Sequence, residues 1–331
     1  MTTLRNLVLG LGLAALASVP AQAETSLLNA SYDVSRELYK EINPAFVAHW
    51  KKEKGVDVTV NQSHGGSTKQ AKSVAEGLEA DVVTLNQATD LDFLAGKDVI
   101  DKDWKSKFPH DAAPYTTTSI FIVRQGNPKG IKDWSDLVKP DISVVIPNPK
   151  TSGNGRYTYL AAWGYALGND KNEDKAREFV TKLFANVPVF DGGGRGATTT
   201  FTQRDVGDVL VTFENEVALL KTEFGDKFDV VYPTLSIEAA PPVAINNIIT
   251  AKRGSLDLAK GYLNFLFSPE AQKIIAKQGF RPRDEAAFAE AKLPAITTFK
   301  VEELIGPWAD AQKKHFADGG IYDQITATKS N

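Results

Sequence analysis

The sequence predicts an α/β protein that folds into two lobes, and three observations carry this prediction. Short apolar runs typical of strands alternate with amphipathic runs typical of helices, which is the pattern of α/β folds. The chain has 331 residues, more than one compact core usually accommodates. No flexible linker, internal repeat or low-complexity tract divides it, so ordered segments have to join the lobes. A single large doubly wound sheet is the alternative arrangement.

These runs place the elements in order along the chain. Short apolar runs predict strands at residues 27–30, 56–61, 80–85, 120–123, 143–146, 187–190, 209–212 and 229–232. Amphipathic runs between and after them predict helices at residues 37–54, 68–77, 155–166, 175–183, 214–224 and 256–267.

Two proline-containing segments are the predicted crossings between the lobes. Ala113-Pro114-Tyr115 and a run of threonines lead into one apolar strand, and Pro241-Pro242 leads into another apolar run. With crossings there, residues 24–112 and 243–331 form lobe 1, and residues 113–242 form lobe 2.

The first 23 residues have the three parts of a cleaved export signal. Arg5 gives a positive start, residues 7–17 are apolar, and Ala21-Gln22-Ala23 is a small-x-small site, so cleavage is expected after Ala23. The apolar stretch is too short to remain as a membrane span, and a buried N-terminal helix is the alternative. No later apolar run reaches about 18 residues.

The sequence contains no cysteine, which excludes disulfides, thiolate chemistry, cysteine-ligated zinc and a lipid-modified N-terminal cysteine. An exported chain without a membrane span or lipid anchor is expected in the periplasm, between two bacterial membranes. Free secretion is the alternative.

Charge and motifs argue against several classes of function. A formal net charge of −3 is not that of a nucleic-acid binder, and any captured anion has to be held by local geometry. The segment Gly192-x-Gly194-x-x-Ala197 matches a dinucleotide fingerprint only loosely. No Gly-x-Ser-x-Gly elbow or Walker loop occurs. The histidines lack metal-ligand spacing: His49, His64, His110 and His315. We therefore expect no enzyme, cofactor or metal site.

Three glycine-rich segments, each following a strand, have the chemistry of an anion site. They span residues 63–68, 151–156 and 191–196. A helix that starts there presents backbone N–H groups without an internal partner, and its dipole favours negative charge. Glycine also lets an oxyanion approach the backbone closely. One such turn is more often a simple helix cap, but three turns, two of them with an arginine, favour an anion.

Longer motifs resemble the periplasmic sulfate/thiosulfate-binding proteins of bacterial ABC importers over nearly the whole mature chain. The segments that carry the resemblance are 31–38, 63–67, 80–84, 147–154, 157–164, 193–201, 207–210 and 280–283. The resemblance implies a type II periplasmic-binding-protein fold, in which two α/β lobes joined by hinge strands close over an anion in the cleft. It also implies a monomer that delivers sulfate to an inner-membrane ABC permease. Molybdate or phosphate is the alternative ligand.

The resemblance further implies which groups contact the anion. Its donors map onto the Ser67 N–H of one lobe and, in the other lobe, onto the Ser152 hydroxyl and the N–H groups of Gly153, Asn154 and Gly194. A site made only of donors suits a dianion that has no proton. Phosphate carries a proton near neutral pH, and burying that proton without an acceptor costs about 1–3 kcal/mol. We therefore expect phosphate to be rejected.

Charged residues are expected beside this pocket. The resemblance places Arg156 and Arg195 there, each paired with an acid such as Asp90 or Asp33. In this interpretation the arginines brace the loops and do not neutralise the anion themselves. Ordinary surface arginines in weak ion pairs are the alternative.

A hydrolase would need a base beside one of the two serine hydroxyls. His64 is the nearest candidate in the sequence to Ser67.

One departure from the family concerns Phe213. Some sulfate binders supply an indole N–H at this position, and phenylalanine cannot donate a hydrogen bond. Losing one charge-assisted bond costs about 1.5–3 kcal/mol, or roughly 10- to 100-fold in affinity. The terminal sulfur of thiosulfate is a poorer acceptor than oxygen and would tolerate an apolar ring. Phe213 therefore favours thiosulfate as a ligand alongside sulfate, and simple packing of the ring is the alternative.

Overall fold

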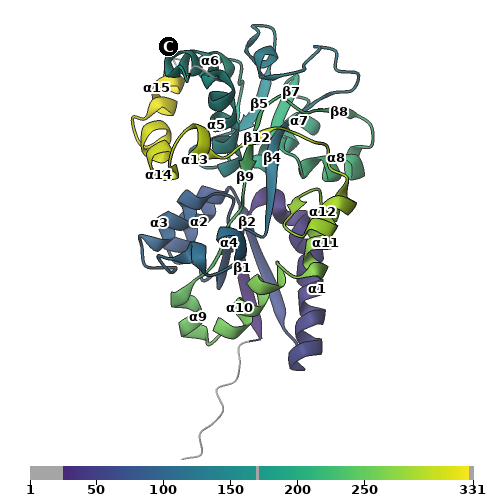
Figure 1. Cartoon of the computed structure of the whole chain (residues 1–331), viewed down its shortest axis with the longest axis vertical. Coiled ribbons are helices and arrows are strands. Elements are labelled where there is room, and N and C mark those ends of the chain that lie inside the picture. Colours follow the sequence, from purple (N-terminus) through teal and green to yellow (C-terminus); the bar gives the residue numbers. More distant parts are fainter. Residues whose placement is uncertain (1–24, 169–170, 328–331) are drawn as a thin grey trace, which may run out of the picture.

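Two α/β lobes, each built on its own sheet, lie one above the other in the computed structural model (Figure 1). The structure describes residues 25–168 and 171–327. The predicted export signal and its cleavage site after Ala23 lie outside the described residues. No helix in the described part of the chain is long and apolar enough to cross a membrane.

The first sheet has four strands in the order β10-β3-β1-β2. Strand β1 is parallel to both of its neighbours, and β10 is antiparallel to β3. The strands are β1 (Ser26–Tyr32), β2 (Thr59–Gly65), β3 (Val82–Thr84) and β10 (Val243–Ile245). The helical segments of this lobe are η1 (Asp33–Ser35), α1 (Arg36–Lys54), α2 (Ser67–Ala75), α3 (Ala88–Ala95), η2 (Trp104–Ser106), α4 (Pro109–Ala112), α9 (Asn247–Arg253), α10 (Leu256–Phe265), α11 (Pro269–Lys277) and α12 (Glu285–Ala291).

Because β1, β2 and β3 are parallel, their carboxyl ends meet at one edge of the sheet. The residues that follow these strands therefore lie close together, as in the ligand sites of other α/β sheets. Asp33 follows β1, Gly66 follows β2, and Asn86 comes two residues after β3.

The second sheet has eight strands, with β12-β9-β4-β7-β5-β6 in order and β8 and β11 also paired to β4. Buried aromatic rings pack against this sheet: Trp134 is fully buried, and its ring meets that of Phe121 edge-on at a centroid distance of 4.9 Å. The strands are β4 (Tyr115–Arg124), β5 (Val144–Pro147), β6 (Phe190–Asp191), β7 (Val209–Phe213), β8 (Phe228–Val231), β9 (Ser236–Ala239), β11 (Arg281–Pro282) and β12 (Thr298–Phe299). The helical segments are η3 (Trp134–Val138), α5 (Gly153–Leu167), α6 (Glu173–Ala185), α7 (Gly194–Thr202), α8 (Glu216–Phe224), α13 (Val301–Leu304), α14 (Trp308–Ala311), η4 (Gln312–Phe316) and α15 (Ile321–Ala327).

Strand β4 carries the chain from the first lobe into the second. Its first two residues pair with β11, the next two with β9, and the rest with β7 and β8. The chain returns between Ala239, the last residue of β9, and Val243, the first of β10. It thus changes sheets at the two proline-containing segments, and the prediction of two α/β lobes is confirmed.

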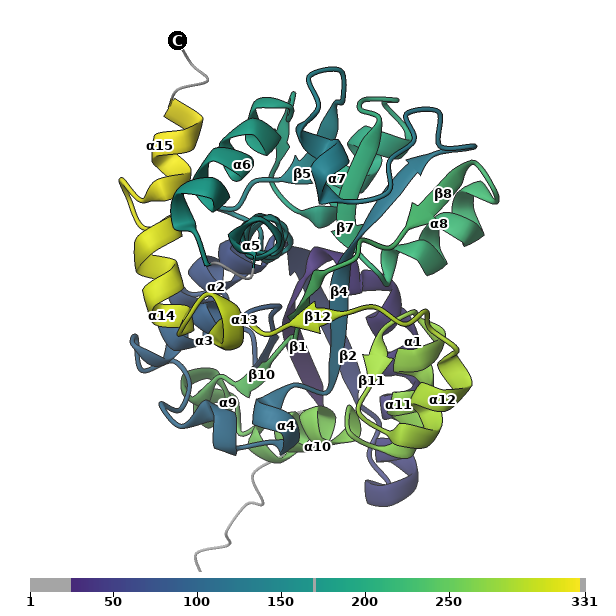
Figure 2. The same cartoon turned by 45° about the horizontal axis from the view of Figure 1, so that its top comes forward.

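The end of the chain departs from the predicted division. Residues 243–331 were assigned to lobe 1, but from Thr298 onwards the described residues pack on the second lobe, beside α5 and α6 (Figure 2). Strand β12 pairs with β9, and Lys150 Nζ lies 2.9 Å from Asp323. The buried ring of His315 accepts or donates a 3.0 Å hydrogen bond with the hydroxyl of Tyr159 in α5. These contacts hold the described residues from Thr298 onwards against the second lobe.

Several strands also differ in extent from the prediction, and two of them bear on the glycine-rich turns. Strand β2 continues to Gly65 because its polar end pairs in register with Ala30–Tyr32 of β1. The first glycine-rich turn therefore begins at Gly66. The strand predicted at 187–190 is reduced to the two residues of β6, which pair with Ile146 and Pro147.

Candidate anion-binding site

Three helix N-termini from the two lobes meet in the interior. Helix α2 begins at Ser67, α5 at Gly153 and α7 at Gly194. A Cβ atom built on Gly66 would lie 2.5 Å from the carbonyl oxygen of Thr151 and 2.6 Å from that of Gly192. One on Gly193 would lie 3.4 Å from the backbone nitrogen of Gly66. The three glycine-rich turns of the sequence are therefore in contact, and only residues without a Cβ allow this approach.

The backbone N–H groups at these helix starts are free to bind an anion. Those of Ser67, Gly153, Asn154 and Gly194 have no acceptor among the residues that the structure describes. All four residues are buried. No side chain caps α2 or α7, whereas in α5 the Ser152 oxygen accepts from the Gly155 N–H at 3.4 Å. Buried N–H groups need a partner, and the helix dipoles favour a negative one.

A buried network supports the Ser67 turn. The Ser67 hydroxyl donates to Asp90 Oδ2 at 2.6 Å, and Thr68 donates to the other oxygen of the same carboxylate at 2.9 Å. Arg156 Nη1 lies 3.9 Å from Asp90, so the predicted pairing of these residues is present. Burial lowers the pKa of Arg156, and Asp90 opposes this. Arg156 Nε also donates to the Pro149 carbonyl at 2.8 Å. The arginine thus ties the turn before α5 to the opposite lobe.

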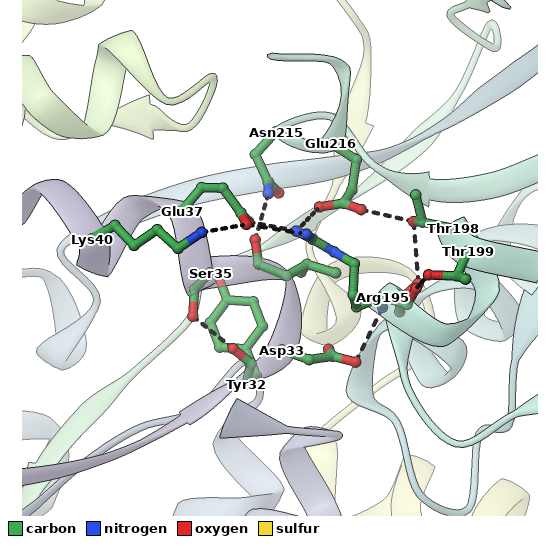
Figure 3. Close-up of polar contacts among 12 residues, drawn as sticks. Tyr32, Asp33, Ser35, Glu37, Lys40, Arg195, Thr198, Thr199, Asn215 and Glu216 are labelled. Atoms are coloured by element: carbon green, nitrogen blue, oxygen red, sulfur yellow. Dashed lines mark hydrogen bonds and ion pairs between the residues drawn. The ribbon is translucent and has the colours of Figure 1, made fainter. Parts of the chain in front are cut away.

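Arg195 is the centre of a second network (Figure 3). Its guanidinium donates to both oxygens of Glu37 in α1, at 3.1 and 2.5 Å, and to Glu216 at 3.0 Å. An acid such as Asp90 or Asp33 was expected as its partner; the guanidinium bonds Glu37 and Glu216, while Asp33 Oδ2 accepts from the Arg195 backbone N–H at 3.1 Å. Burial acts to lower the pKa of Arg195, but the charges of Glu216, Glu37 and Asp33 raise it. Thr198 donates to the second oxygen of Glu216 at 2.7 Å.

The pKa values in this network follow from burial and from the charge of Arg195. Burial raises the pKa of Asp33, and it raises that of Glu216 to about 7. Burial by itself would raise the pKa of Glu37 too. The hydrogen bonds and the charge of Arg195 outweigh burial and hold this pKa below its usual value. Glu37 and Glu216 were not predicted, since nothing in the sequence pairs them with an arginine 158 and 21 positions away.

Comparison with known proteins agrees with this geometry. The family of bacterial extracellular solute-binding proteins matches residues 27–281. The chain belongs to this family. It is 55% identical over 310 residues to the thiosulfate-binding protein of Pseudomonas aeruginosa, covering 92% of this chain and 93% of that one. It is 51% identical over 307 residues to the sulfate-binding protein of Escherichia coli, with the same coverage.

Solved structures give the same result for the fold. The sulfate-binding protein of Mycobacterium tuberculosis superposes on this solute-binding protein with a TM-score of 0.80 at 32% identity, covering 88% of this chain and all of that one. A periplasmic thiamin-binding protein, 17% identical, shares the fold with a TM-score of 0.66 over 88% of this chain and 95% of that one. The family resemblance read from the sequence is confirmed.

Phe213 lies at the carboxyl end of β7 in this solute-binding protein, fully buried. Its ring meets the ring of Tyr157 at a centroid distance of 5.8 Å. The neighbouring Thr212 hydroxyl accepts from Asn154 Nδ2 at 3.3 Å, which brings the end of β7 close to the start of α5.

The histidine nearest to Ser67 in the sequence is not its hydrogen-bond partner. The Ser67 hydroxyl is directed at Asp90, and His64 Nδ1 has no partner in the described part of the chain. Burial, together with the charge of Arg36, lowers the pKa of His64 to about 4. No hydrogen bond joins His64 to the hydroxyl of Ser67 or Ser152 in the described part of the chain.

Proposed function

We propose that this protein captures sulfate, and thiosulfate as a second ligand, between its two lobes and delivers the anion to an ABC permease. The observation that carries the proposal is the meeting of free N–H groups from both lobes at the starts of α2, α5 and α7. The relatives named for sulfate and thiosulfate point to the same ligands, and they favour neither molybdate nor phosphate. They are binding proteins, which supports capture without catalysis.

Local dipoles hold the anion in this proposal. The N–H groups of Ser67, Gly153, Asn154 and Gly194 and the Ser152 hydroxyl donate to its oxygens. The nearby arginines are already paired with carboxylates, so they position the loops. The carboxylate of Asp33 is satisfied by the Arg195 N–H. A proton-free dianion matches such donors, whereas a protonated phosphate brings a donor of its own.

Closure of the lobes is the signal in the proposed transport cycle. Because the donors are divided between the lobes, the ligand binds the closed form better and shifts the population toward it. The closed, loaded protein then docks on the permease. We place this cycle in the periplasm, reached through cleavage of the signal after Ala23, with the protein acting as a monomer.

The ring of Phe213 bears on the choice between the two ligands. It offers no donor at the end of β7, beside Asn154 and Thr212. A terminal sulfur tolerates this apolar environment better than an oxygen that needs a hydrogen bond. We infer that thiosulfate binds with an affinity close to that of sulfate.

Titration calorimetry of the purified protein tests the proposal. We expect sulfate and thiosulfate to bind and phosphate and molybdate to bind much more weakly. Ser152→Ala removes one charge-assisted hydrogen bond and should weaken sulfate binding roughly 10- to 100-fold. Ser106→Ala, at an exposed serine of η2, is the matched control. Absence of binding to both sulfur anions, or a preference for phosphate or molybdate, would overturn the function. An unchanged Ser152→Ala affinity would remove that hydroxyl from the site.

A further inference from the structure

Asn86 lies between donors of the two lobes. Its backbone N–H donates to the Ser67 hydroxyl at 3.0 Å. Its side chain reaches across to the other lobe, where Oδ1, Cγ and Nδ2 lie 1.7, 2.5 and 2.8 Å from the place that a Cβ on Gly153 would occupy. The residue is only 2% exposed. One asparagine therefore touches the first residue of α5 while it is anchored to the start of α2.

The Asn86 carboxamide lies at the N-terminal end of α5, where the N–H groups of Gly153 and Asn154 have no acceptor among the described residues. In an α-helix each Cα–Cβ bond tilts toward the helix N-terminus. The space of a Gly153 Cβ is therefore on the N-terminal side of α5, and the Asn86 carboxamide fills it. The N–H groups of Gly153 and Asn154 face the same end of the helix.

The oxygen of this carboxamide is not satisfied within the described part of the chain. Asn86 Oδ1 is buried and has no hydrogen-bond partner among the described residues. A buried amide group without a partner destabilises the fold, and such groups are usually matched by a ligand or by another polar group. A carboxamide carries a donor and an acceptor, and rotation about its Cβ–Cγ bond exchanges their positions. It can therefore present N–H to an anion that arrives between Ser67 and Gly153.

We propose that the Asn86 carboxamide is a further contact to the bound anion and donates an N–H to one of its oxygens. This inference rests on the proposed function. The Asn86 N–H supplies a side-chain donor from the first lobe, in addition to the donors that the family resemblance implies. Because the carboxamide is neutral, it binds a dianion without the charge repulsion that a carboxylate would impose at the same position.

The proposal predicts that two substitutions weaken sulfate binding to different degrees and that only one of them strengthens phosphate binding. Asn86→Ala removes the donor and should lower sulfate affinity about 10- to 100-fold. Asn86→Asp replaces the donor with a group that only accepts hydrogen bonds and carries a negative charge. We expect this variant to lose sulfate binding more than 100-fold and to bind phosphate more tightly than the unaltered protein, because its carboxylate accepts the phosphate proton.

The experiment titrates sulfate, thiosulfate and phosphate into the unaltered protein, both variants and Asn246→Ala. Asn246 is an equally buried asparagine that caps α9, so its loss should affect stability and leave affinity unchanged. Thermal unfolding of each protein shows that it is folded. If Asn86→Asp does not fold, Asn86→Leu, similar in size and without a donor, should reproduce the loss seen in Asn86→Ala.

The outcomes separate this inference from the proposed function. If the unaltered protein binds neither sulfate nor thiosulfate, the proposed function fails. If it binds sulfate and the alanine or leucine variant binds within about twofold of it, Asn86 only packs between the lobes and this inference is overturned. Weaker sulfate binding in the Asn86 variants, with Asn246→Ala unaffected, supports it.

Discussion

At the scale of single residues, the charges around the three glycine-rich turns are paired with one another. Asp90 accepts hydrogen bonds from Ser67 and Thr68 and faces Arg156, and the charge of Arg195 is shared by Glu37 and Glu216. Removing one partner of such a buried pair leaves the other uncompensated, which is strongly destabilising. These paired charges brace the turns, and in the proposed function the uncharged N–H groups are the contacts to the ligand.

A histidine outside the site gives a pH dependence of stability. Burial, with a contribution from Lys314, lowers the pKa of His315 from 6.5 to about 4. The folded state therefore favours the neutral ring, so its contribution to stability is complete above pH 6.5 and is lost as the pH falls toward 4. This loss amounts to about 3 kcal/mol of unfolding free energy.

Urea unfolding at several pH values in this range checks the prediction for His315. The variant His315→Gln should be less stable near neutral pH, because the bond to Tyr159 is altered, but should lose less stability on acidification. His49→Gln, at a half-buried histidine on α1, is the control for the loss of one imidazole elsewhere in the chain. If the unfolding free energy fell equally with decreasing pH in all three proteins, His315 would not be the source of this pH dependence.

At the scale of elements, the sequence predicts the pieces of the site but not their meeting. Helices α2 and α5 were predicted, and their first turns were recognised as anion-ready; the apolar residues of α2 lie on one face, whereas α5 is buried on nearly every side. Helix α7 was not among the predicted helices, since residues 194–202 are mostly glycine and threonine, which are poor helix formers. Its preceding glycine-rich turn was nevertheless recognised.

The contacts between distant elements could not be read from the sequence. Gly66, Thr151 and Gly192 touch although they lie far apart in the chain, and their composition does not specify this approach. The same reason explains why Asn86 was overlooked, because an asparagine after a short strand usually belongs to a turn. It also explains the tail from Thr298, whose partner β9 no local pattern identifies.

Gly66 offers a test of the approach of the two lobes. Its backbone angles, φ −56° and ψ 135°, suit alanine, but the added Cβ would lie 2.5 Å from the Thr151 oxygen and 2.6 Å from the Gly192 oxygen. Gly66→Ala should therefore fold normally and bind sulfate at least tenfold more weakly, about 1.4 kcal/mol or more.

The neighbouring glycine is the matched control. A Cβ on Gly65 meets only Gln70, at the ordinary distance of 3.6 Å, so Gly65→Ala should keep its affinity. Calorimetry and thermal unfolding distinguish the two variants. Normal sulfate binding by Gly66→Ala would mean that the two turns need not meet in the bound form.

At the scale of the whole molecule, side-chain interactions beside the three glycine-rich turns join the lobes. Arg195 of α7 reaches Glu37 of α1, and Asn215 Nδ2 donates to the Val34 carbonyl at 3.0 Å (Figure 3). On the other side, Arg156 of α5 reaches Thr89 at 3.4 Å and Asp90 at 3.9 Å. If closure accompanies binding as we propose, these contacts favour the closed form, and we expect part of the sulfate affinity to come from residues that do not touch the ligand.

The link between Arg195 and Glu37 permits a direct test of this coupling. Both side chains are about one-fifth exposed, so their interaction is only partly screened by solvent. Glu37→Gln removes the charge that α1 contributes and should lower sulfate affinity about three- to tenfold, or about 0.7–1.4 kcal/mol. The loss should come mainly from faster release, because the closed form opens more readily. Stopped-flow measurement of release after dilution into excess unlabelled anion would record it.

Glu41→Gln is the control for this last variant. Glu41 lies one turn further along α1 and pairs with Lys277 of α11 at 2.8 Å, within the first lobe. Glu41→Gln removes one negative charge from α1, as Glu37→Gln does, but leaves the contacts with the second lobe intact. Its release rate should stay at the original value while that of Glu37→Gln rises, and added salt should narrow the difference between them. Equal release rates in both variants would show that the ion pair accompanies closure without stabilising it.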